Sequence, residues 1–174
     1  MARPDGLTVR DARPEEYRRL SDLTVAGFEE YRARMPEAAW TPYAADLADV
    51  AGRARLGRTL VAVAGGQPVG VVALYPPGPA VPDLFPSGAA YIRALAAHPD
   101  WRGRGVGRLL TEACIDATRA AGHESVGLNT HQLMVAARGL YERLGFQVIG
   151  TFTLPDYGTF YSYLLPLGPQ AGAG

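Results

Sequence analysis

The segment of this chain best suited to chemistry is a glycine-rich turn with two arginines, Arg102-Gly103-Arg104-Gly105-Val106-Gly107. Glycines adopt backbone conformations closed to other residues and let the backbone come close to a ligand. Successive N–H groups at the start of a helix can then converge on phosphate oxygens, where the helix dipole is positive. The turn therefore predicts a pyrophosphate-binding site, and with it a cofactor that carries a nucleotide.

The segments on either side of this turn are the ones that such a site needs. Residues 90–97 form a small, apolar run with strand character that ends at His98-Pro99-Asp100. Beyond the turn, apolar residues recur at helical spacing along a helix that we expect to end near Gly122. This stripe consists of Val106, Leu109, Leu110, Ala113, Cys114 and Ala117.

The rest of the chain alternates between strand-like and helix-like segments. The pattern predicts helices at 14–31, 42–55, 106–121 and 134–144, and further strands at 7–10, 59–64, 68–75, 125–130, 146–153 and 160–165. Gly65-Gly66-Gln67 predicts a hairpin, and residues 76–88, with five prolines, predict a loop that borders a substrate pocket. We expect one α/β domain at 7–165, with disordered ends at 1–6 and 166–174.

Composition narrows the class of protein. A length of 174 residues, 48% of them hydrophobic, suits one globular domain. The 17 basic and 17 acidic residues cancel, and no block of like charge occurs, which excludes a sequence-independent nucleic-acid or membrane-surface binder. A small-molecule or peptide partner is predicted instead. Every basic residue is arginine, which excludes a phosphate loop ending in Gly-Lys and lysine Schiff-base chemistry.

Cys114 is the only cysteine, which excludes disulfides and cysteine-based metal sites, and no metal is predicted. Its place on the helical stripe predicts a packing role. The first thirteen residues lack the apolar core of a signal peptide, and no stretch approaches about 20 uninterrupted apolar residues. We therefore predict a cytoplasmic protein without a membrane span.

With these motifs placed, the chain resembles the GNAT superfamily of acyl-CoA-dependent N-acyltransferases. The resemblance is carried by Arg102-x-x-Gly105-x-Gly107 after the strand ending Leu95-Ala96-Ala97-His98-Pro99, and by Leu140-Tyr141-Glu142-Arg143-Leu144-Gly145-Phe146. Together these motifs cover residues 89–146. The resemblance implies a single α+β domain, with a mixed, mostly antiparallel seven-stranded sheet, about four helices and a splay between strands 4 and 5.

The same resemblance implies acetyl-CoA as the cofactor. The backbone amides of residues 102–107 would bind the pyrophosphate of coenzyme A. Its pantetheine arm would lie between the strands at 91–97 and 125–130 and hydrogen-bond backbone like an added strand. The implied cofactor-binding residues are Leu95, Ala96, Ala97, Arg102, Gly103, Arg104, Gly105, Val106, Gly107, Asn129, Met134 and Ala137.

The chemistry implied is direct attack of a primary amine on the thioester, with no covalent enzyme intermediate. The resemblance assigns Tyr141 as the acid that protonates the leaving thiolate. A tyrosine hydroxyl has a reference pKa near ~10, so it stays protonated at neutral pH and suits this role. The alternative role of a tyrosine in an apolar helix is core packing.

Two positions depart from the family pattern. Many members have an acidic residue where this chain has Tyr91, so no general base is assigned. Members often have an asparagine that contacts the cofactor where this chain has Met134, which cannot make that amide hydrogen bond. Backbone groups, Asn129 or Gln132 could make the contact in its place. The other conceivable proton acceptors each have a simpler structural role, and a water chain is an equal alternative. These acceptors are His98, His131, Glu29 and Glu30.

Aromatic residues near helix ends and in loops predict the acceptor site. Rings of this kind suit an apolar or flat substrate, or a cation held against a ring face, and their alternative role is core packing. They do not distinguish an amino acid, a peptide N-terminus, a polyamine and an antibiotic amine as the acceptor. The aromatic residues predicted for the acceptor site are Phe28, Tyr31, Trp40, Phe85, Tyr91 and Tyr157.

A homodimer is a further expectation from the resemblance.

Two other classes of protein compete with an acetyltransferase. A dinucleotide-binding oxidoreductase needs Gly-x-Gly-x-x-Gly directly after a strand, but Arg108 occupies the third glycine position here. A catalytically silent domain that binds acyl-CoA as a sensor or partner module is left open by the missing acidic residue.

Overall fold

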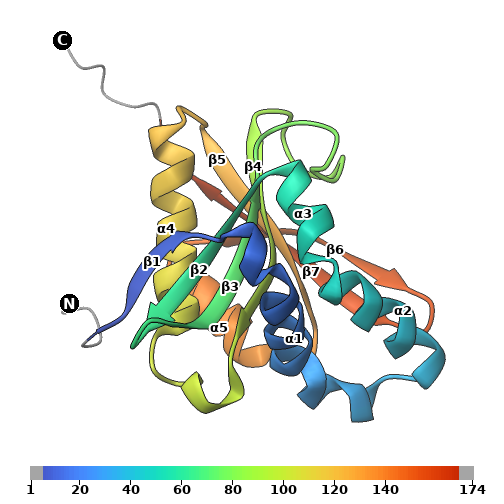
Figure 1. Cartoon of the computed structure of the whole chain (residues 1–174). Helices are drawn as coiled ribbons and strands as arrows, with labels where there is room; N and C mark the ends of the chain where they lie inside the picture. The colour runs from blue at the N-terminus through green and yellow to red at the C-terminus, as the bar shows by residue number, and fades with distance from the viewer. Residues whose placement is uncertain (1–5, 169–174) are drawn as a thin grey trace.

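The computed structural model describes residues 6–168, in which seven strands form one sheet (Figure 1). The strand order is β1-β2-β3-β4-β5-β7-β6, and only β4 and β5 run parallel. This confirms the predicted mixed, mostly antiparallel sheet and excludes the doubly wound parallel sheet of the oxidoreductase alternative. The strands are β1 (Thr8–Asp11), β2 (Arg58–Ala64), β3 (Gln67–Tyr75), β4 (Ala89–Ala97), β5 (Ser125–His131), β6 (Gln147–Leu154) and β7 (Gly158–Pro166).

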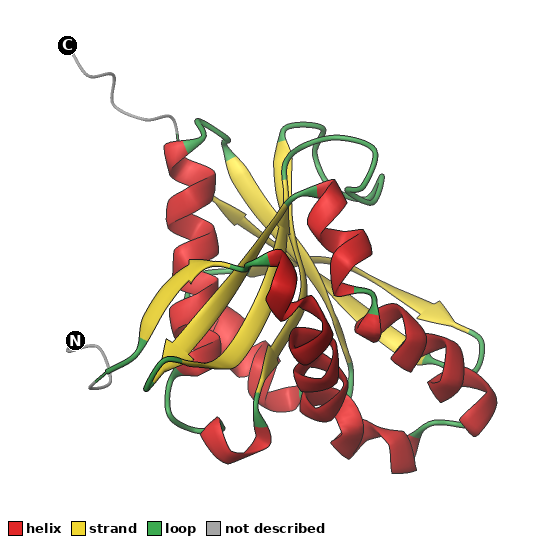
Figure 2. Ribbon diagram, in the orientation of Figure 1, coloured by secondary structure: helices red, strands yellow, loops and turns green. Residues whose placement is uncertain are grey.

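Helices cover both faces of the sheet (Figure 2). Side chains alternate between the two faces of a strand, so Leu60 and Ala62 of β2 join the core under α4, whereas Val61 and Val63 join the core under α1. Both faces of β2 are therefore buried. The helices are α1 (Tyr17–Phe28), α2 (Glu37–Ala48), α3 (Val50–Leu56), α4 (Val106–Ala120) and α5 (Val135–Arg143), with short 3-10 segments at Pro14–Glu16, Glu29–Arg34 and Pro99–Trp101.

The prediction of one helix at 42–55 is wrong in its first residue and in treating the segment as a single helix. The structure has two helices here, and α2 begins six residues after Tyr31, because Pro36 O accepts the N–H groups of Ala39 and Trp40. Asp49 then has a non-helical ψ of 61°, and its side chain caps α3 by accepting the Gly52 N–H at 2.8 Å. The domain therefore has five α-helices where about four were expected.

The sheet opens between β4 and β5, as predicted. The two strands pair only from Ala89–Ile92 to Ser125–Leu128. Just beyond, Ala94 has a φ of +52° and forms a bulge, because β4 has one more residue than β3 between paired positions. From there β4 stays with β3, β5 stays with β7, and a gap separates them.

The chain remains in contact with the domain slightly beyond its predicted end. Pro166 pairs with Ser125 in β7, and Leu167 N–H donates to Glu124 O at 2.8 Å. Residues 1–5, and residues 169–174 of the predicted tail, lie outside the described residues. No helix in the described part is long and apolar enough to cross a bilayer.

Glu16 joins the start of the chain to its first helical turn, which leads to a prediction about acid stability. Its carboxylate accepts from Arg10 Nη1 at 2.8 Å and from Arg13 N–H at 2.9 Å. The Arg10 hydrogen bond lowers the pKa of Glu16 from 4.5 to about 2. The stabilisation is therefore complete above the unfolded-state pKa and is lost as the pH falls toward 2.

We expect Glu16→Gln to lower the free energy of unfolding by about 1 kcal/mol at pH 7, and not at pH 2. Urea unfolding at both pH values measures this difference. A loss of the same size at pH 2 would show that the carboxylate charge is not responsible.

Cys114 lies inside the core, as predicted, and should be chemically silent in the folded protein. The side chain is fully buried on α4, and burial raises its thiol pKa to about 12. Because the thiolate is the reactive species, we expect no reaction with a chromogenic disulfide reagent at pH 8 and one equivalent after denaturation. Reaction of the native protein would contradict this burial.

Candidate active site

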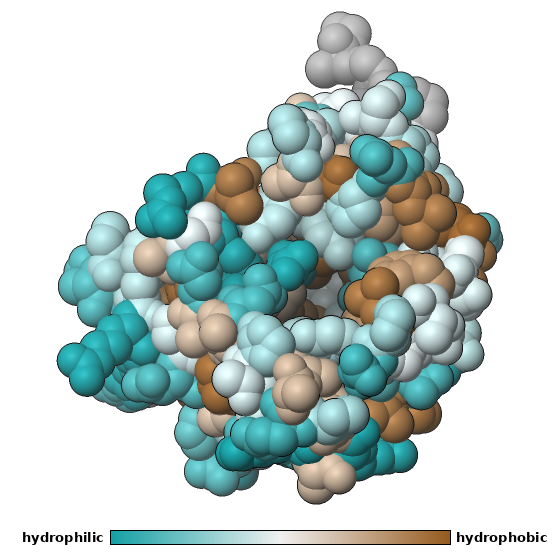
Figure 3. Space-filling model, turned by 90° about the vertical axis from the view of Figure 1, so that its right-hand side faces the viewer, coloured by the Kyte–Doolittle hydropathy of each residue, from teal (hydrophilic) through white to brown (hydrophobic). Residues whose placement is uncertain are grey.

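A cavity of about 440 Å³ lies where β4 and β5 separate. Its walls come from β4 on both sides of the bulge, the end of β5, the end of α1, α5, one face of α2, and the β6–β7 hairpin. Figure 3 looks onto the side of the molecule that carries α2 and this hairpin, which is hollowed near its centre. Segments from nearly the whole length of the chain therefore meet here.

Most of the residues predicted for the cofactor and acceptor line this cavity. The seven cofactor residues on its wall are Leu95, Ala96, Ala97, Arg102, Asn129, Met134 and Ala137. Tyr141 and four of the predicted acceptor residues, Phe28, Tyr31, Tyr91 and Tyr157, line it as well. The rest of the glycine turn, residues 103–107, does not line the cavity and leads from Arg102 into α4.

The glycine turn has the backbone geometry of an anion cradle. Gly103 and Gly105 have φ values of +71° and +80°, the left-handed region that favours glycine. The first bond of α4 runs from Leu109 N–H to Gly105 O, so the N–H groups of the first residues of α4 point out of the helix. A Cβ atom on Gly103 would meet no heavy atom within 4 Å, so the turn is open to a ligand.

The two arginine side chains of the turn are held by the protein itself. Arg102 Nη2 donates to Gly27 O at 3.0 Å and pairs with Glu30 at 3.2 Å, which joins the turn to the end of α1. The Arg104 guanidinium lies 5.0 Å from the centre of the Trp101 ring. Of the backbone amides in the turn, those of Arg102 and Arg104 already donate to Pro99 O at 3.3 Å and to Trp101 O at 3.4 Å, so its other N–H groups are the ones left to face a phosphate.

Tyr141 occupies the wall of the cavity from α5. Its ring packs against Phe146 and Tyr163, with centroids 5.7 and 6.1 Å away, and the residue is 5% exposed. Burial raises the pKa of its hydroxyl above the ordinary value of 10. The hydroxyl is therefore kept protonated over the whole range in which an enzyme would be assayed.

Met134, which departs from the family pattern, and Asn129, which could replace its contact, each have a hydrogen-bond partner within the protein. Met134 Sδ accepts from Thr130 Oγ1 at 3.6 Å. Asn129 Oδ1 accepts from Ser162 Oγ at 2.7 Å, which joins β5 to β7 just beyond the parallel pair. Asn129 lines the cavity, whereas Gln132 is exposed and does not line it.

The proton acceptors considered from the sequence are all engaged elsewhere. His131 lines the cavity, but its Nδ1 accepts the Leu133 N–H at 3.1 Å and its Nε2 donates to Tyr157 O at 2.5 Å, so both ring nitrogens are occupied. His98 lies outside the cavity and accepts the Asp100 N–H at 3.3 Å. Glu29 and Glu30 pair with Arg32 and Arg102. Among the described residues on the wall, Asp46 supplies the carboxylate.

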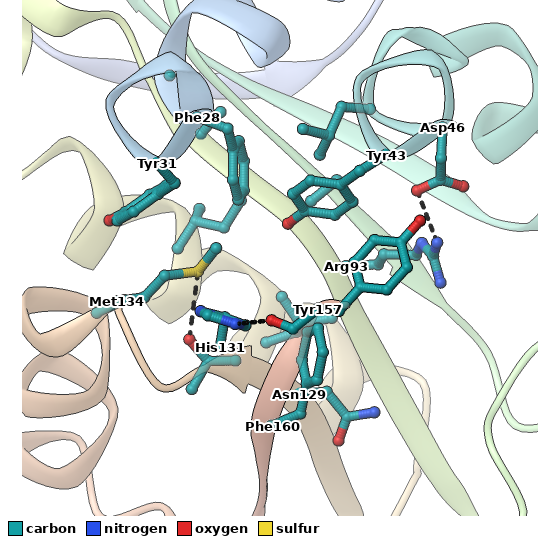
Figure 4. Close-up of a pocket in the computed structure, with 18 of the residues that line it drawn as sticks. Phe28, Tyr31, Tyr43, Asp46, Arg93, Asn129, His131, Met134, Tyr157 and Phe160 are labelled. Carbon is teal, nitrogen blue, oxygen red and sulfur yellow. Dashed lines mark hydrogen bonds and ion pairs between the residues drawn. The ribbon is translucent and has the colours of Figure 1, made fainter. Parts of the chain in front are cut away.

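Aromatic rings from three segments enclose one end of the cavity (Figure 4). Phe28 contacts Tyr43 edge to face at 6.0 Å, and Tyr43 contacts Tyr157 of the β6–β7 hairpin at 6.4 Å. Burial raises the tyrosyl pKa of Tyr43 and of Tyr91, so both hydroxyls stay neutral and can donate hydrogen bonds.

Two predicted acceptor residues, Trp40 and Phe85, do not line this cavity. Trp40 is buried behind Tyr43, with ring centroids 6.1 Å apart. Phe85 packs beside Tyr91 at 5.3 Å, and a Cβ atom on Gly127 would lie 2.4 Å from its ring. Both therefore support residues that line the cavity. The proline-rich loop that contains Phe85 does not border this cavity either, contrary to expectation.

The lining residues missed from the sequence include three with polar or charged groups at the acceptor end: Tyr43, Asp46 and Arg93. Arg93 Nη2 donates to Asp46 Oδ2 at 2.8 Å, which joins β4 to α2. Burial opposes the charge of Arg93, but the Asp46 hydrogen bond and charge outweigh it and raise the guanidinium pKa. A signal was present, because a lone arginine in the middle of an apolar strand needs a partner or a ligand.

Comparisons with known proteins agree with this geometry. The model of the acetyltransferase (GNAT) family matches residues 17–146. N-acetyltransferase family 8 member 3 of Rattus norvegicus is 33% identical over 105 residues, which are 60% of this chain and 42% of that protein. The chain spans less than half the length of the curated relatives it matches.

Solved structures show the same fold. A GCN5-related N-acetyltransferase from Rhodopseudomonas palustris superposes with a TM-score of 0.71 at 24% identity, over 96% of this chain and 98% of that one. The yncA protein of Salmonella typhimurium, solved with its cofactor acetyl-CoA, superposes with a TM-score of 0.68 at 20% identity, over 98% and 99% of the two chains.

Sheet order, the gap beyond the parallel pair and the glycine turn beside it define a GNAT-like domain. The chain belongs to the GNAT acetyltransferase family.

Proposed function

We propose that the protein transfers the acetyl group of acetyl-CoA to a primary amine of a small molecule or peptide. One observation carries the proposal: the opened end of β4, Arg102 at the start of the glycine turn and the buried, hydroxyl-bearing Tyr141 line one cavity. The neighbour from Salmonella typhimurium binds acetyl-CoA as its cofactor.

The cofactor would follow the unpaired edge of β4. His98 N–H donates to Val69 O on the β3 side. Because successive residues of a strand direct their backbone groups to opposite edges, the N–H and C=O of Ala97 and Leu95 face the gap. These groups would pair with the amides of the pantetheine arm, and the N–H groups at the start of α4 would bind the pyrophosphate.

The reaction would then proceed in a water-restricted cavity. The neutral amine nitrogen attacks the thioester carbonyl carbon, and the tetrahedral intermediate collapses with cleavage of the C–S bond. Tyr141 donates its hydroxyl proton to the leaving sulfur and is reprotonated from solvent, while the amine proton leaves to water at the cavity mouth. No covalent enzyme intermediate forms.

The second candidate function, a silent module that binds acyl-CoA, is favoured by one observation: Tyr91 occupies the position of the usual acidic residue and is buried and uncharged. Binding and turnover separate the two. We expect acetyl-CoA, and not NAD, to raise the melting temperature, and an amine panel to release CoA. Stabilisation without CoA release from any amine would support the silent module, and stabilisation by NAD alone would overturn both functions.

A further inference from the structure

The acceptor end of the cavity contains one ion pair, Arg93 with Asp46, among aromatic side chains. Figure 4 shows the pair on the far side of Tyr43 from Met134 and Tyr31. Arg93 lies two residues before Leu95, where the proposed path of the cofactor arm ends, at its greatest distance along β4 from the pyrophosphate-binding turn. The pair therefore lies beside the place where an incoming amine would meet the thioester.

Arg93 has hydrogen-bonding capacity that the protein does not use. A guanidinium carries five N–H donors in a planar fork, and the bond from Nη2 to Asp46 is its one hydrogen bond among the described residues. The side chain is 42% exposed, so the remaining donors are accessible to a ligand. A planar fork with free donors suits a carboxylate, which it can bind through two parallel hydrogen bonds.

Arg53, the other arginine beside Asp46, is not available for this role. It is 6% exposed, and its two terminal nitrogens donate to the backbone carbonyls of Asp46 and Leu47.

Asp46 and Arg93 also line a second cavity, on the α3 side, so the ion pair lies between two cavities. An acceptor held by Arg93 would thus have its charged group at this boundary and its apolar part among the rings.

A cation held by Asp46 is the competing arrangement. The two charges of the pair lie 2.8 Å apart and cancel, so charge alone favours neither a bound cation nor a bound anion. The chemistry of the reaction disfavours the cation, because an amine that remained bound as an ammonium ion on Asp46 would be unable to attack. A carboxylate on Arg93 leaves the amine of the same molecule free to lose its proton.

We propose, as an extension of the acetyltransferase function, that Arg93 binds the carboxylate of the acceptor, which is an α-amino acid with a large apolar side chain. Asp46 acts as a positioning residue that orients the guanidinium. Tyr43 and Tyr157 contact the acceptor side chain. Peptide N-termini and simple amines, which lack a carboxylate next to the amine, are then poor acceptors.

Matched acceptors test the proposal on the whole protein. Phenylalanine, leucine and methionine are each compared as the amino acid, its amide and the corresponding amine without the carboxyl group, with CoA release as the readout. We expect kcat/KM for the amino acid to exceed that of its two partners by at least about tenfold, as for hydrogen bonds to a charged group. Equal or faster turnover of the amides or amines, or no turnover of any amino acid, would overturn the proposal.

Variants of the ion pair supply the second readout. Arg93→Gln should raise KM for the amino acid by about 10- to 100-fold, remove its advantage over the amine and leave the acetyl-CoA Kd unchanged. Arg93→Lys should retain part of the advantage, and Asp46→Asn should weaken it less than Arg93→Gln does. Arg58→Gln, which breaks the Arg58–Asp11 pair between β2 and β1, is the matched control and should leave all kinetic values unchanged.

The ratio between amino acid and amine distinguishes recognition from damage to the fold, because misfolding lowers both rates together. If Arg93→Gln leaves the ratio of the amino-acid rate to the amine rate unchanged, Arg93 does not bind the carboxylate. Failure of acetyl-CoA to bind would instead remove the proposed function itself. Binding and amine turnover without preference for a carboxylate would remove only this inference.

Discussion

Replacement of Tyr141 by phenylalanine is expected to lower kcat by about 100- to 1,000-fold, the range for loss of a general acid. The Kd for acetyl-CoA should change by less than about twofold, because the ring remains and only the hydroxyl is removed. The ring packs against Phe146 and Tyr163, so the variant keeps the contacts that hold α5 in place. Stopped-flow or steady-state CoA release gives kcat, and titration calorimetry gives the Kd.

The pH profile adds a test of the same residue. Because burial raises the pKa of Tyr141, the proton donor should not be lost between pH 7 and 10, and wild-type kcat should not fall in that range for this reason. Tyr163→Phe is the matched control: this tyrosine packs on Tyr141 but does not line the cavity, and its hydroxyl donates to Glu142 at 2.7 Å. It should lose some stability and retain turnover. A Tyr141→Phe variant with wild-type kcat would show that the hydroxyl is not the acid.

Substitution of Gly105 by valine should weaken acetyl-CoA binding by at least about 100-fold. Gly105 has a φ of +80°, which a β-branched residue adopts only at a cost of about 1–3 kcal/mol. Relief of that strain turns the peptide groups at the start of α4 away from the position where they would bind a pyrophosphate. Titration calorimetry with acetyl-CoA measures the loss.

A control substitution at a second glycine distinguishes the effect of backbone strain on stability from loss of the cofactor-binding turn. Gly66 in the β2–β3 hairpin has a φ of +77°, and a Cβ atom there would meet nothing within 4 Å. Gly66→Val should therefore lower the melting temperature by a similar amount and keep full affinity for the cofactor. Tight acetyl-CoA binding by Gly105→Val, or equal loss in both variants, would contradict a specific role for the turn.

Several elements were predictable because they depend on neighbours in the chain. The apolar stripe of α4 predicts the helix from its spacing, and the helix ends close to Gly122, which has a φ of +78°. Gly65 and Gly66 form the predicted hairpin with positive φ values. Helix α2 was misplaced because Pro42 is compatible with a first turn, whereas the backbone carbonyl of Pro36 accepts the first bonds of the helix.

The acceptor end of the site was far less predictable. Arg93 and Asp46 are 47 positions apart in the sequence and meet only because the fold brings α2 and β4 to the wall of the same cavity. Trp40 and Phe85 are aromatic, like the residues that line the cavity, yet they pack behind the lining residues Tyr43 and Tyr91. Residue type alone does not tell a lining ring from a supporting one.

The sequence by itself determined the glycine turn, the strand and helix on either side of it and the family resemblance that points to coenzyme A. These features are encoded in contiguous residues, where steric limits on the backbone and hydrophobic periodicity act locally. Only the tertiary structure decided which side chains form the acceptor end, because that choice depends on how distant helices, a bulged strand and a hairpin pack together.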